Sequence, residues 1–320
     1  MRRYGLTVPF AGGGLGELRP VVEEAVSLGY TDLWSAEADG QDGFTPLALA
    51  SVWAPSARLG GAIFPAYTRG PALLAMSAAS LEQAAPGRFV MGLGASSPAI
   101  VERWNGIPFE EPYKRTRDVL RFLNKALTGE KINEKFESFE IQGFRLGVKL
   151  DSPPKIMLAA LREGMLRLAA RESDGAILNW LSTEDAKRVT KIVKDIGPGK
   201  ETVARLFVAP NADAEQVRAM ARFAVNAYVN VPVYKAFHQW LGRDALGETW
   251  EKWEAGDRKG AAAAIPDHVV DELVIHGPPE KCREHIAEYV ANGIDTPVLA
   301  IMPFGIDPLK AMRDLAPGAL

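Results

Sequence analysis

The chain has 320 residues, of which 47% are hydrophobic and 24% charged, and this composition excludes a disordered or fibrous protein. Its formal net charge of −3 gives no general attraction to nucleic acid or to an anionic membrane surface. No apolar run reaches the roughly 18 residues that a membrane-spanning helix needs, so a membrane protein is not expected.

Short apolar runs alternate with amphipathic runs along most of the chain. In the first half, strands are predicted over 4–9, 31–36, 58–64 and 88–93, and helices over 17–28, 45–54, from Pro71 onward and over 112–127. In the second half, strands are predicted over 155–159, 174–179, 203–209 and 297–302, and helices over 163–172, 183–196 and 279–292. Eight strand–helix steps favour a single TIM-type (β/α)₈ barrel, and alternation alone leaves an open doubly wound sheet as the alternative.

Three stretches interrupt this alternation, near residues 95–110, 129–152 and 211–272. The polar stretch 129–152 is expected to form a small hairpin, and 211–272 is long enough for several helices. Insertions in barrels usually lie over the C-terminal face of the sheet, where substrate is held, and we expect these to do the same. Oligomer contact or simple cover is an equally open interpretation of residues 211–272.

Hydrolytic and metal chemistry find little support in the sequence. The four histidines show no metal-ligand spacing, so no metal site is expected, and no Gly-x-Ser-x-Gly motif indicates a serine hydrolase. Acidic pairs such as Glu23–Glu24 leave glycoside hydrolysis open. The single cysteine, Cys282, indicates a buried helix residue, and Gly12 to Gly14 interrupt the first apolar stretch too early for a signal peptide, so a cytoplasmic location is expected.

Three strand ends carry unusual residues. Gly92-Leu93-Gly94-Ala95-Ser96-Ser97-Pro98 follows a strand with two glycines and two hydroxyls, which suits a phosphate cradle or, equally, a structural turn. It lacks the third glycine and the following helix of a dinucleotide-binding motif. Gly60-Gly61 within a strand indicates a bulge or a close approach of backbone or ligand. The strand 174–179 ends in Asn179 and Trp180, where barrel enzymes keep working residues.

At these segments the chain resembles the luciferase-like superfamily of barrel oxidoreductases. It is most similar to the branch that depends on the deazaflavin coenzyme F420 and includes methylenetetrahydromethanopterin reductase. The matching stretches run over Arg69–Pro98, Trp104–Phe109, Pro112–Arg115, Lys155–Leu161 and Ser173–Asn179. The resemblance extends over nearly the whole chain, and the motifs are specific only as a set.

The resemblance implies where a cofactor would lie. In that family the third strand carries a non-prolyl cis peptide whose bulge supports the deazaflavin ring, which by position is Ala62–Ile63 here. The other implied contacts with the phosphate, tail or ring are Gly94, Ala95, Ser96, Ser97, Ala159, Ala160, Leu161 and Asn179. Glu37 matches the acidic position near the ring and is the expected catalytic residue.

One position departs from the pattern of the relatives that oxidise alcohols. They carry a histidine after the acidic residue, whereas this chain has Ala38. We therefore expect reduction of an activated C=C or C=N bond in a small organic substrate, with hydride from reduced F420. The expected substrate contacts, of which the aromatic ones equally suit core packing, are Phe10, Phe64, Trp180, Tyr228 and His238.

Two other functions stay open at this point. An FMN-dependent monooxygenase of the same superfamily would use the same pocket with oxygen as co-substrate. A barrel that lost its cofactor would act as a binding or scaffold protein, although such a protein has no need of a phosphate cradle. By analogy with similar barrels, a homodimer is expected.

Overall fold

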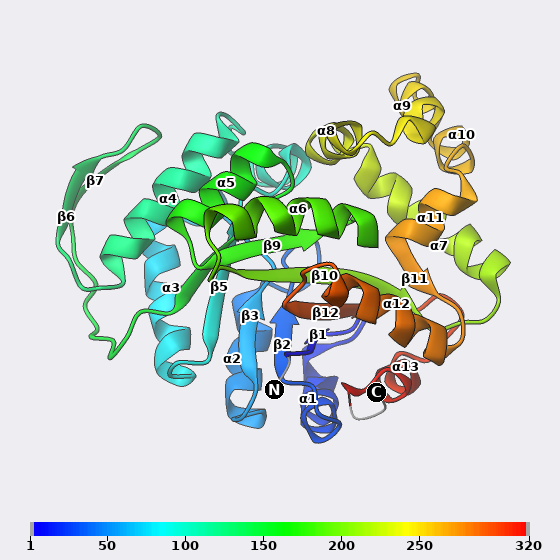
Figure 1. Cartoon of the computed structure of the whole chain (residues 1–320). Helices are drawn as coiled ribbons and strands as arrows, with labels where there is room; N and C mark the ends of the chain where they lie inside the picture. The colour runs from blue at the N-terminus through cyan, green and yellow to red at the C-terminus, as the bar shows by residue number, and fades with distance from the viewer. Residues whose placement is uncertain (1–2, 318–320) are drawn as a thin grey trace.

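Eight parallel strands close into a barrel, as the sequence predicts (Figure 1). Around the barrel the strands follow the order β12-β1-β2-β3-β5-β8-β9-β10, and β10 pairs again with β12 to close it. Their bounds in the computed structural model, which describes residues 3–317, are β1 (Gly5–Thr7), β2 (Asp32–Ser35), β3 (Arg58–Gly61), β5 (Phe89–Gly94), β8 (Lys155–Ala159), β9 (Gly175–Asn179), β10 (Glu201–Ala209) and β12 (Thr296–Ile301). A two-residue strand, β4 (Phe64–Pro65), continues the third wall beside β5.

Helices cover the outside of these strands (Figure 1). They are α1 (Leu18–Ser27), α2 (Phe44–Trp53), α3 (Pro71–Ala84), α4 (Pro112–Ala126), α5 (Glu163–Glu172), α6 (Thr183–Ile196) and α12 (Pro279–Ala291), followed by α13 (Pro308–Asp314). Proline opens α3, α4 and α12, where its missing N–H costs no helical hydrogen bond. The predicted bounds agree with these within two residues where both were given, and α13 was not predicted. None of the helices within residues 3–317 is both long and apolar enough to cross a bilayer.

Residues 211–272 form a helical subdomain over the carboxyl ends of β9 and β10. Its helices are α7 (Ala214–Val229), α8 (Pro232–Leu241), α9 (Gly247–Glu254), α10 (Arg258–Ala263) and α11 (Asp267–Leu273). A second hydrophobic core joins Trp180, Phe207 and Ala300 of the barrel to Val217, Val225 and Val270 of these helices. After α11 the short strand β11 (Val274–His276), which was not predicted, pairs with β10 beyond the end of β9.

The hairpin β6 (Ile132–Lys135) and β7 (Glu140–Phe144) forms as expected, but the prediction that it lies over the C-terminal face is wrong. It leaves the end of α4 and returns to the start of β8, so its base lies at the amino-terminal rim of the barrel (Figure 1). The hairpin then packs along the outside of α4, where Phe136, Phe139 and Phe144 surround Phe122. The 129–152 segment therefore braces α4.

A single layer of side chains fills the middle of the barrel. It consists of Trp34, Val90, Met157, Ile177, Val203 and Val298. Trp34 fits only because its neighbouring strand positions lack side chains: a Cβ on Gly60 would lie 2.4 Å from the Trp34 ring, and one on Gly5 would lie 3.1 Å from it. Gly60 thus makes room for a tryptophan inside the barrel, and Gly61 makes room for the Phe64 ring, which a Cβ there would approach to 2.2 Å.

An ion-pair network closes the amino-terminal end below that layer. The buried guanidinium of Arg58 donates to Asp32, and to both carboxylate oxygens of Glu201 at 2.8 and 2.7 Å. Thr296 also donates to Glu201, at 2.6 Å. Burial raises the pKa of Glu201, but the hydrogen bonds and charge of Arg58 outweigh it and lower that pKa to about 2. The four residues begin β2, β3, β10 and β12, so the network joins strands around the barrel.

The Gly60→Ala variant should be destabilised, because its methyl group would overlap the rigid ring of Trp34. We expect a loss of about 1–3 kcal/mol in the free energy of unfolding, the usual cost of overpacking a core, measured by urea denaturation. Gly199→Ala, where a Cβ meets nothing within 4 Å, is the matched control and should change little. Equal midpoints for Gly60→Ala and the wild-type protein would contradict this account of the barrel interior.

Candidate active site

The carboxyl ends of several barrel strands carry partly exposed residues directly above the filled layer. Ala62 and Ile63 follow β3 and pack against that layer, and Ala159 and Asn179 end β8 and β9. Arg205 of β10 pairs in register with Asn179. Because strand side chains alternate, Asn179 and Arg205 project on the same side as the interior residues two positions before each of them. We call the carboxyl-terminal ends of the barrel strands, which carry Ala62, Ile63, Ala159, Asn179 and Arg205, the rim.

A closely packed apolar surface forms on one side of the rim. The Ala62–Ile63 peptide bond is cis, as the family resemblance implies. Gly94 lies between its neighbours so closely that a Cβ there would be 2.9 Å from Cβ of Ala159 and 3.0 Å from Cδ1 of Ile63. The side chains of Ile63 and Ala159 therefore meet over Gly94 in one continuous apolar surface.

Next to this surface the chain presents unbonded backbone N–H groups. Ser96 has a φ of 66°, which is uncommon for a residue with a side chain. Within residues 3–317 the backbone N–H groups of Ser96 and Ser97 donate no hydrogen bond, and the Ser97 hydroxyl accepts one from Ile100 at 3.4 Å. A short π-helix, η2 (Ala99–Trp104), follows. Nearby along the rim, α5 begins just after Ala160 and Leu161 without a side-chain cap. Such N–H groups can bind an anion.

Glu37 follows β2 and has both carboxylate oxygens engaged. Oε2 accepts the backbone N–H of Gly43 at 2.8 Å, and Oε1 pairs with Arg69 at 2.5 Å. Only 14% of the Glu37 side chain is exposed. This carboxylate therefore holds the loop between β2 and α2 against Arg69, which itself lies over the Phe44 ring at 5.2 Å.

Arg205 is the rim residue that the sequence analysis missed. Its Nε donates to the Thr7 hydroxyl of β1 at 3.3 Å, so the side chain reaches across the barrel interior past β12. Its guanidinium lies 5.0 Å from the centre of the Phe207 ring. Burial lowers the pKa of Arg205, and the nearby Tyr228 and Tyr234 oppose that shift. A lone arginine inside the apolar run 203–209 is the sequence signal that could have revealed it.

Aromatic side chains from the helical subdomain lie beside Arg205. Tyr234 of α8 donates its hydroxyl to Asn179 Oδ1 at 3.0 Å, and its ring meets Tyr228 of α7 edge-on. Trp180 stacks on Phe207 with ring centres 3.8 Å apart and has a φ of 52°. Within residues 3–317, three non-glycine residues have a positive φ, and two of them, Ser96 and Trp180, follow barrel strands at this rim. Such conformations often mark functional sites.

Three of the predicted substrate contacts are buried in the structure. Phe64 is fully buried and stacks on Phe44 at 3.8 Å, His238 is fully buried, and Trp180 retains 1% of its exposed surface. The structure offers substrate no exposed surface on these three, because packing against neighbouring rings and helices covers them. Phe10 and Tyr228 stay partly exposed near the ends of β1 and β10.

His238 lies in a polar cluster inside the subdomain. Arg243 donates to its Nδ1 at 3.1 Å and also to Asp185 at 2.6 Å. Because arginine only donates, Nδ1 must be unprotonated and Nε2 carries the proton. Burial, and then the charge of Arg243, lower the pKa of His238 to about 3 against the opposing effect of Asp185. His238 is therefore a neutral structural residue.

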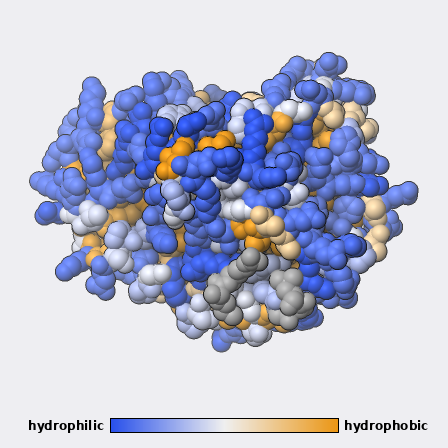
Figure 2. All heavy atoms as spheres, in the orientation of Figure 1, coloured by the Kyte–Doolittle hydropathy of each residue, from blue (hydrophilic) through white to orange (hydrophobic). Residues whose placement is uncertain are grey.

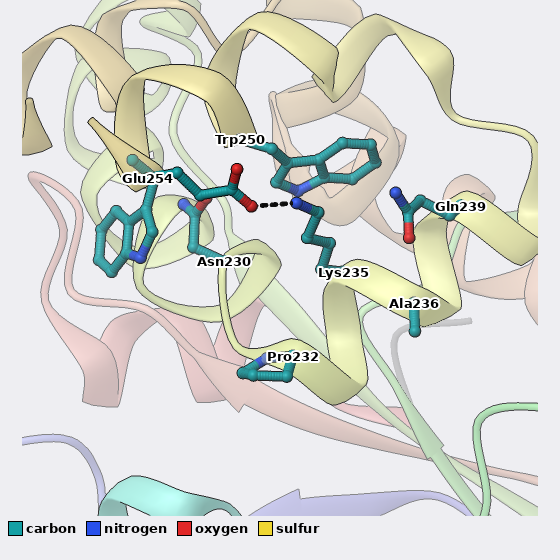
Figure 3. Close-up of a pocket in the computed structure, with 8 residues that line it drawn as sticks. Asn230, Pro232, Lys235, Ala236, Gln239, Trp250 and Glu254 are labelled. Carbon is teal, nitrogen blue, oxygen red and sulfur yellow. Dashed lines mark hydrogen bonds and ion pairs between the residues drawn. The ribbon is translucent and has the colours of Figure 1, made fainter. Parts of the chain in front are cut away.

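The subdomain also contains a cavity of about 380 Å³ between α8 and α9 (Figure 3). Trp250, Trp253 and Gln239 line it, together with the ion pair of Lys235 and Glu254. None of the predicted site residues lines this cavity. Figure 2 shows that the face of the molecule drawn there is mostly hydrophilic, with small separate apolar areas.

The chain forms a closed barrel of parallel strands, and residues 5–296 match the luciferase-like monooxygenase family model. The chain belongs to this family. It is 28% identical over 312 residues to 5,10-methylenetetrahydromethanopterin reductase of Archaeoglobus fulgidus, which covers 93% of this chain and 92% of that protein. It is 26% identical over an alignment of 339 positions to a putative coenzyme F420-dependent oxidoreductase of Mycobacterium tuberculosis. The alignment covers 92% of both chains.

Among solved structures, the coenzyme F420-dependent tetrahydromethanopterin reductase of Methanopyrus kandleri has the same fold. It superposes with a TM-score of 0.80 at 18% identity, covering 99% of this chain and 97% of that one. The family and the barrel fold expected from the sequence are therefore confirmed.

His238→Gln should change how stability depends on pH. In the native protein His238 stays neutral until about pH 3, whereas in the unfolded chain it gains a proton near its ordinary pKa of 6.5. This residue therefore contributes stability above pH 6.5 that is lost as pH falls toward 3, at about 1.4 kcal/mol per pH unit. Chemical denaturation at pH 6, 5 and 4 should show that slope removed in His238→Gln and kept in the exposed control His268→Gln. Parallel curves for wild type and His238→Gln would refute the neutral buried histidine.

Proposed function

We propose that this protein is an F420-dependent oxidoreductase that transfers a hydride between the deazaflavin and a small organic substrate, reducing an activated C=C or C=N bond. The observation that carries the proposal is the apolar surface of Ile63 and Ala159 packed over Gly94, beside the unbonded N–H groups of Ser96 and Ser97. The two sequence relatives, one named as a methylenetetrahydromethanopterin reductase and one as F420-dependent, support it.

The residues present fit a ring joined to a phosphate-bearing tail. A planar ring packs best on a smooth apolar surface, and a side chain at Gly94 would disrupt that surface by pushing Ile63 and Ala159 apart. A phosphate needs hydrogen-bond donors, which Ser96, Ser97 and the start of α5 offer. Residues 62–63, 94–97, 159–161 and Asn179 would hold the cofactor, as the resemblance implies. When bound, the deazaflavin supplies the hydride.

The chain's own part in this chemistry is mainly orientation. The Ile63 surface would fix one face of the ring, and the aromatic residues around Tyr228 would limit access of water from the other side. Glu37 would position the loop between β2 and α2 through Gly43 and Arg69, or relay a proton at its carboxylate. With Ala38 in place of histidine, alcohol oxidation by the route of the relatives lacks its proton-transfer group.

Two alternatives stay with this proposal. The family is described as a monooxygenase family, so FMN with oxygen as co-substrate is the second candidate. A barrel without cofactor is the third. The homodimer and the cytoplasmic location stay predictions from the sequence.

Titration of the purified protein with F420 and with FMN, followed by tryptophan fluorescence, tests the proposal. We expect tight binding of F420 and weak binding of FMN. Gly94→Val should weaken F420 binding about 10-fold or more, because its side chain would displace Ile63 at roughly the cost of overpacking. Gly147→Val, in open space, is the matched control.

Each outcome of this titration identifies one function. A preference for FMN would move the protein to the monooxygenase alternative. Binding of neither cofactor would leave the scaffold as the best description. Equal F420 affinity of Gly94→Val and the wild-type protein would show that the ring does not lie on this surface.

Glu37→Gln tests the role of the carboxylate. The amide keeps the size but loses the charge that pairs with Arg69, so we expect turnover to fall about 10²-fold, in the range for general acid–base catalysis, while F420 affinity is kept. Turnover would be measured on the fastest substrate from a screen of enones and imines. Asp39→Asn, on the exposed part of the same loop, is the control. Wild-type rates for Glu37→Gln would remove Glu37 from the mechanism.

A further inference from the structure

Arg205 lies inside the barrel at the strand ends and, among the described residues, has no carboxylate partner, whereas Arg88 and Arg115, two half-buried arginines that also lack one, donate to backbone carbonyls. Arg58 pairs with Asp32 and Glu201, and Arg243 pairs with Asp185 and Glu272. Within residues 3–317, Arg205 has no carboxylate within 4.0 Å, and its one hydrogen bond goes to the neutral hydroxyl of Thr7. It is thus a positive charge at the strand ends without a counter-ion.

The two terminal nitrogens of the Arg205 guanidinium have no acceptor within residues 3–317. Only Nε is engaged, at Thr7, and within the described part of the chain neither Nη1 nor Nη2 donates a hydrogen bond. These two nitrogens form the fork that binds two oxygens of a carboxylate side by side. The Phe207 ring at 5.0 Å lies against the guanidinium but leaves the fork without an acceptor.

The surroundings of Arg205 suit a ligand. The residue is partly exposed, and its register partner Asn179 is partly exposed too. Tyr234 donates to Asn179 from one side, and Tyr228 stands beside Tyr234. No acidic side chain pairs with any of these four residues within residues 3–317.

We propose that the Nη1–Nη2 fork of Arg205 binds a planar pair of anionic oxygens, and that this pair is a carboxylate of the substrate. The inference rests on the proposed function, because it assigns the substrate class of the same site: small organic acids in which the reducible bond lies close to a carboxylate. A carbonyl oxygen of the deazaflavin ring is the other acceptor that the fork would meet at this rim.

The test uses sodium cinnamate as probe and its neutral amide, cinnamamide, as isostere. Binding is measured by isothermal titration at constant ionic strength, with and without saturating F420. Wild-type protein should bind cinnamate at least about 10-fold more tightly than cinnamamide, because two charge-assisted hydrogen bonds are worth at least that factor, and Arg205→Met should lose that preference. Arg205→Lys should recover part of it. The exposed Arg171→Met, with the same change in charge, should behave as wild type.

Thermal stability provides a second measurement that does not depend on any ligand. An unpaired charge of low exposure destabilises the fold, so Arg205→Met should raise the melting temperature by about 2 °C or more. A residue kept only to hold β10 against Thr7 would give the opposite sign. A lower melting temperature with unchanged cinnamate binding would overturn the proposal.

The cofactor measurement separates the two acceptors, the substrate carboxylate and a ring carbonyl of the cofactor. F420 affinity within about 2-fold of wild type in Arg205→Met supports the substrate assignment. A loss of F420 affinity together with no cinnamate preference in the wild type would assign the fork to the ring and overturn it. Absence of F420 binding by the wild type would refute the proposed function, whereas the cinnamate titration without cofactor would still report on Arg205 directly.

Discussion

The closed end of the barrel depends on the charge of Arg58. Its guanidinium holds Asp32 and Glu201, and through Glu201 also Thr296, so residues that begin four strands share one hydrogen-bonded network. Such a buried charge is tolerated only because every partner is present. Above it, Trp34 and five apolar residues fill the interior. A ligand therefore has access to the barrel only from the opposite rim, and that is where the irregular backbone and the partly exposed residues lie.

Much of the fold could be predicted because its signals are local. Prolines at 71 and 112 begin helices, and apolar runs such as 155–159 are strands with the predicted bounds. Strand β11 could not be predicted, because three residues directly after α11 carry too little pattern and form a strand only by pairing with β10. The position of the hairpin follows from chain order, because a segment between a helix and the next strand lies at the amino-terminal rim. The expectation that it lies over the C-terminal face came from the general position of barrel insertions.

The sequence predicted where the site lies but did not predict its charged residue, Arg205. The family resemblance indicated the cis bond at 62–63, which the structure contains, and directed attention to Gly94 and Glu37. Residue type alone did not tell exposed aromatic side chains from buried ones, since exposure of Phe64 or Trp180 depends on rings contributed from distant parts of the chain. Arg205 was not predicted as a site residue because the rest of the strand 203–209 is apolar. Strand alternation places Val203, Arg205 and Phe207 on one face, which would have put a charge inside the barrel.

The two arginines inside the barrel, Arg58 and Arg205, differ in their partners. At the closed end, where no ligand enters, Arg58 is neutralised by two carboxylates. At the rim, Arg205 has only a hydroxyl and aromatic neighbours, although an apolar residue would have satisfied the strand without the cost of burying a charge. Proteins break the rules of stable packing chiefly where function requires it. Glu37 is occupied by Arg69 and His238 is buried and neutral, whereas both Nη groups of Arg205 have no acceptor within residues 3–317.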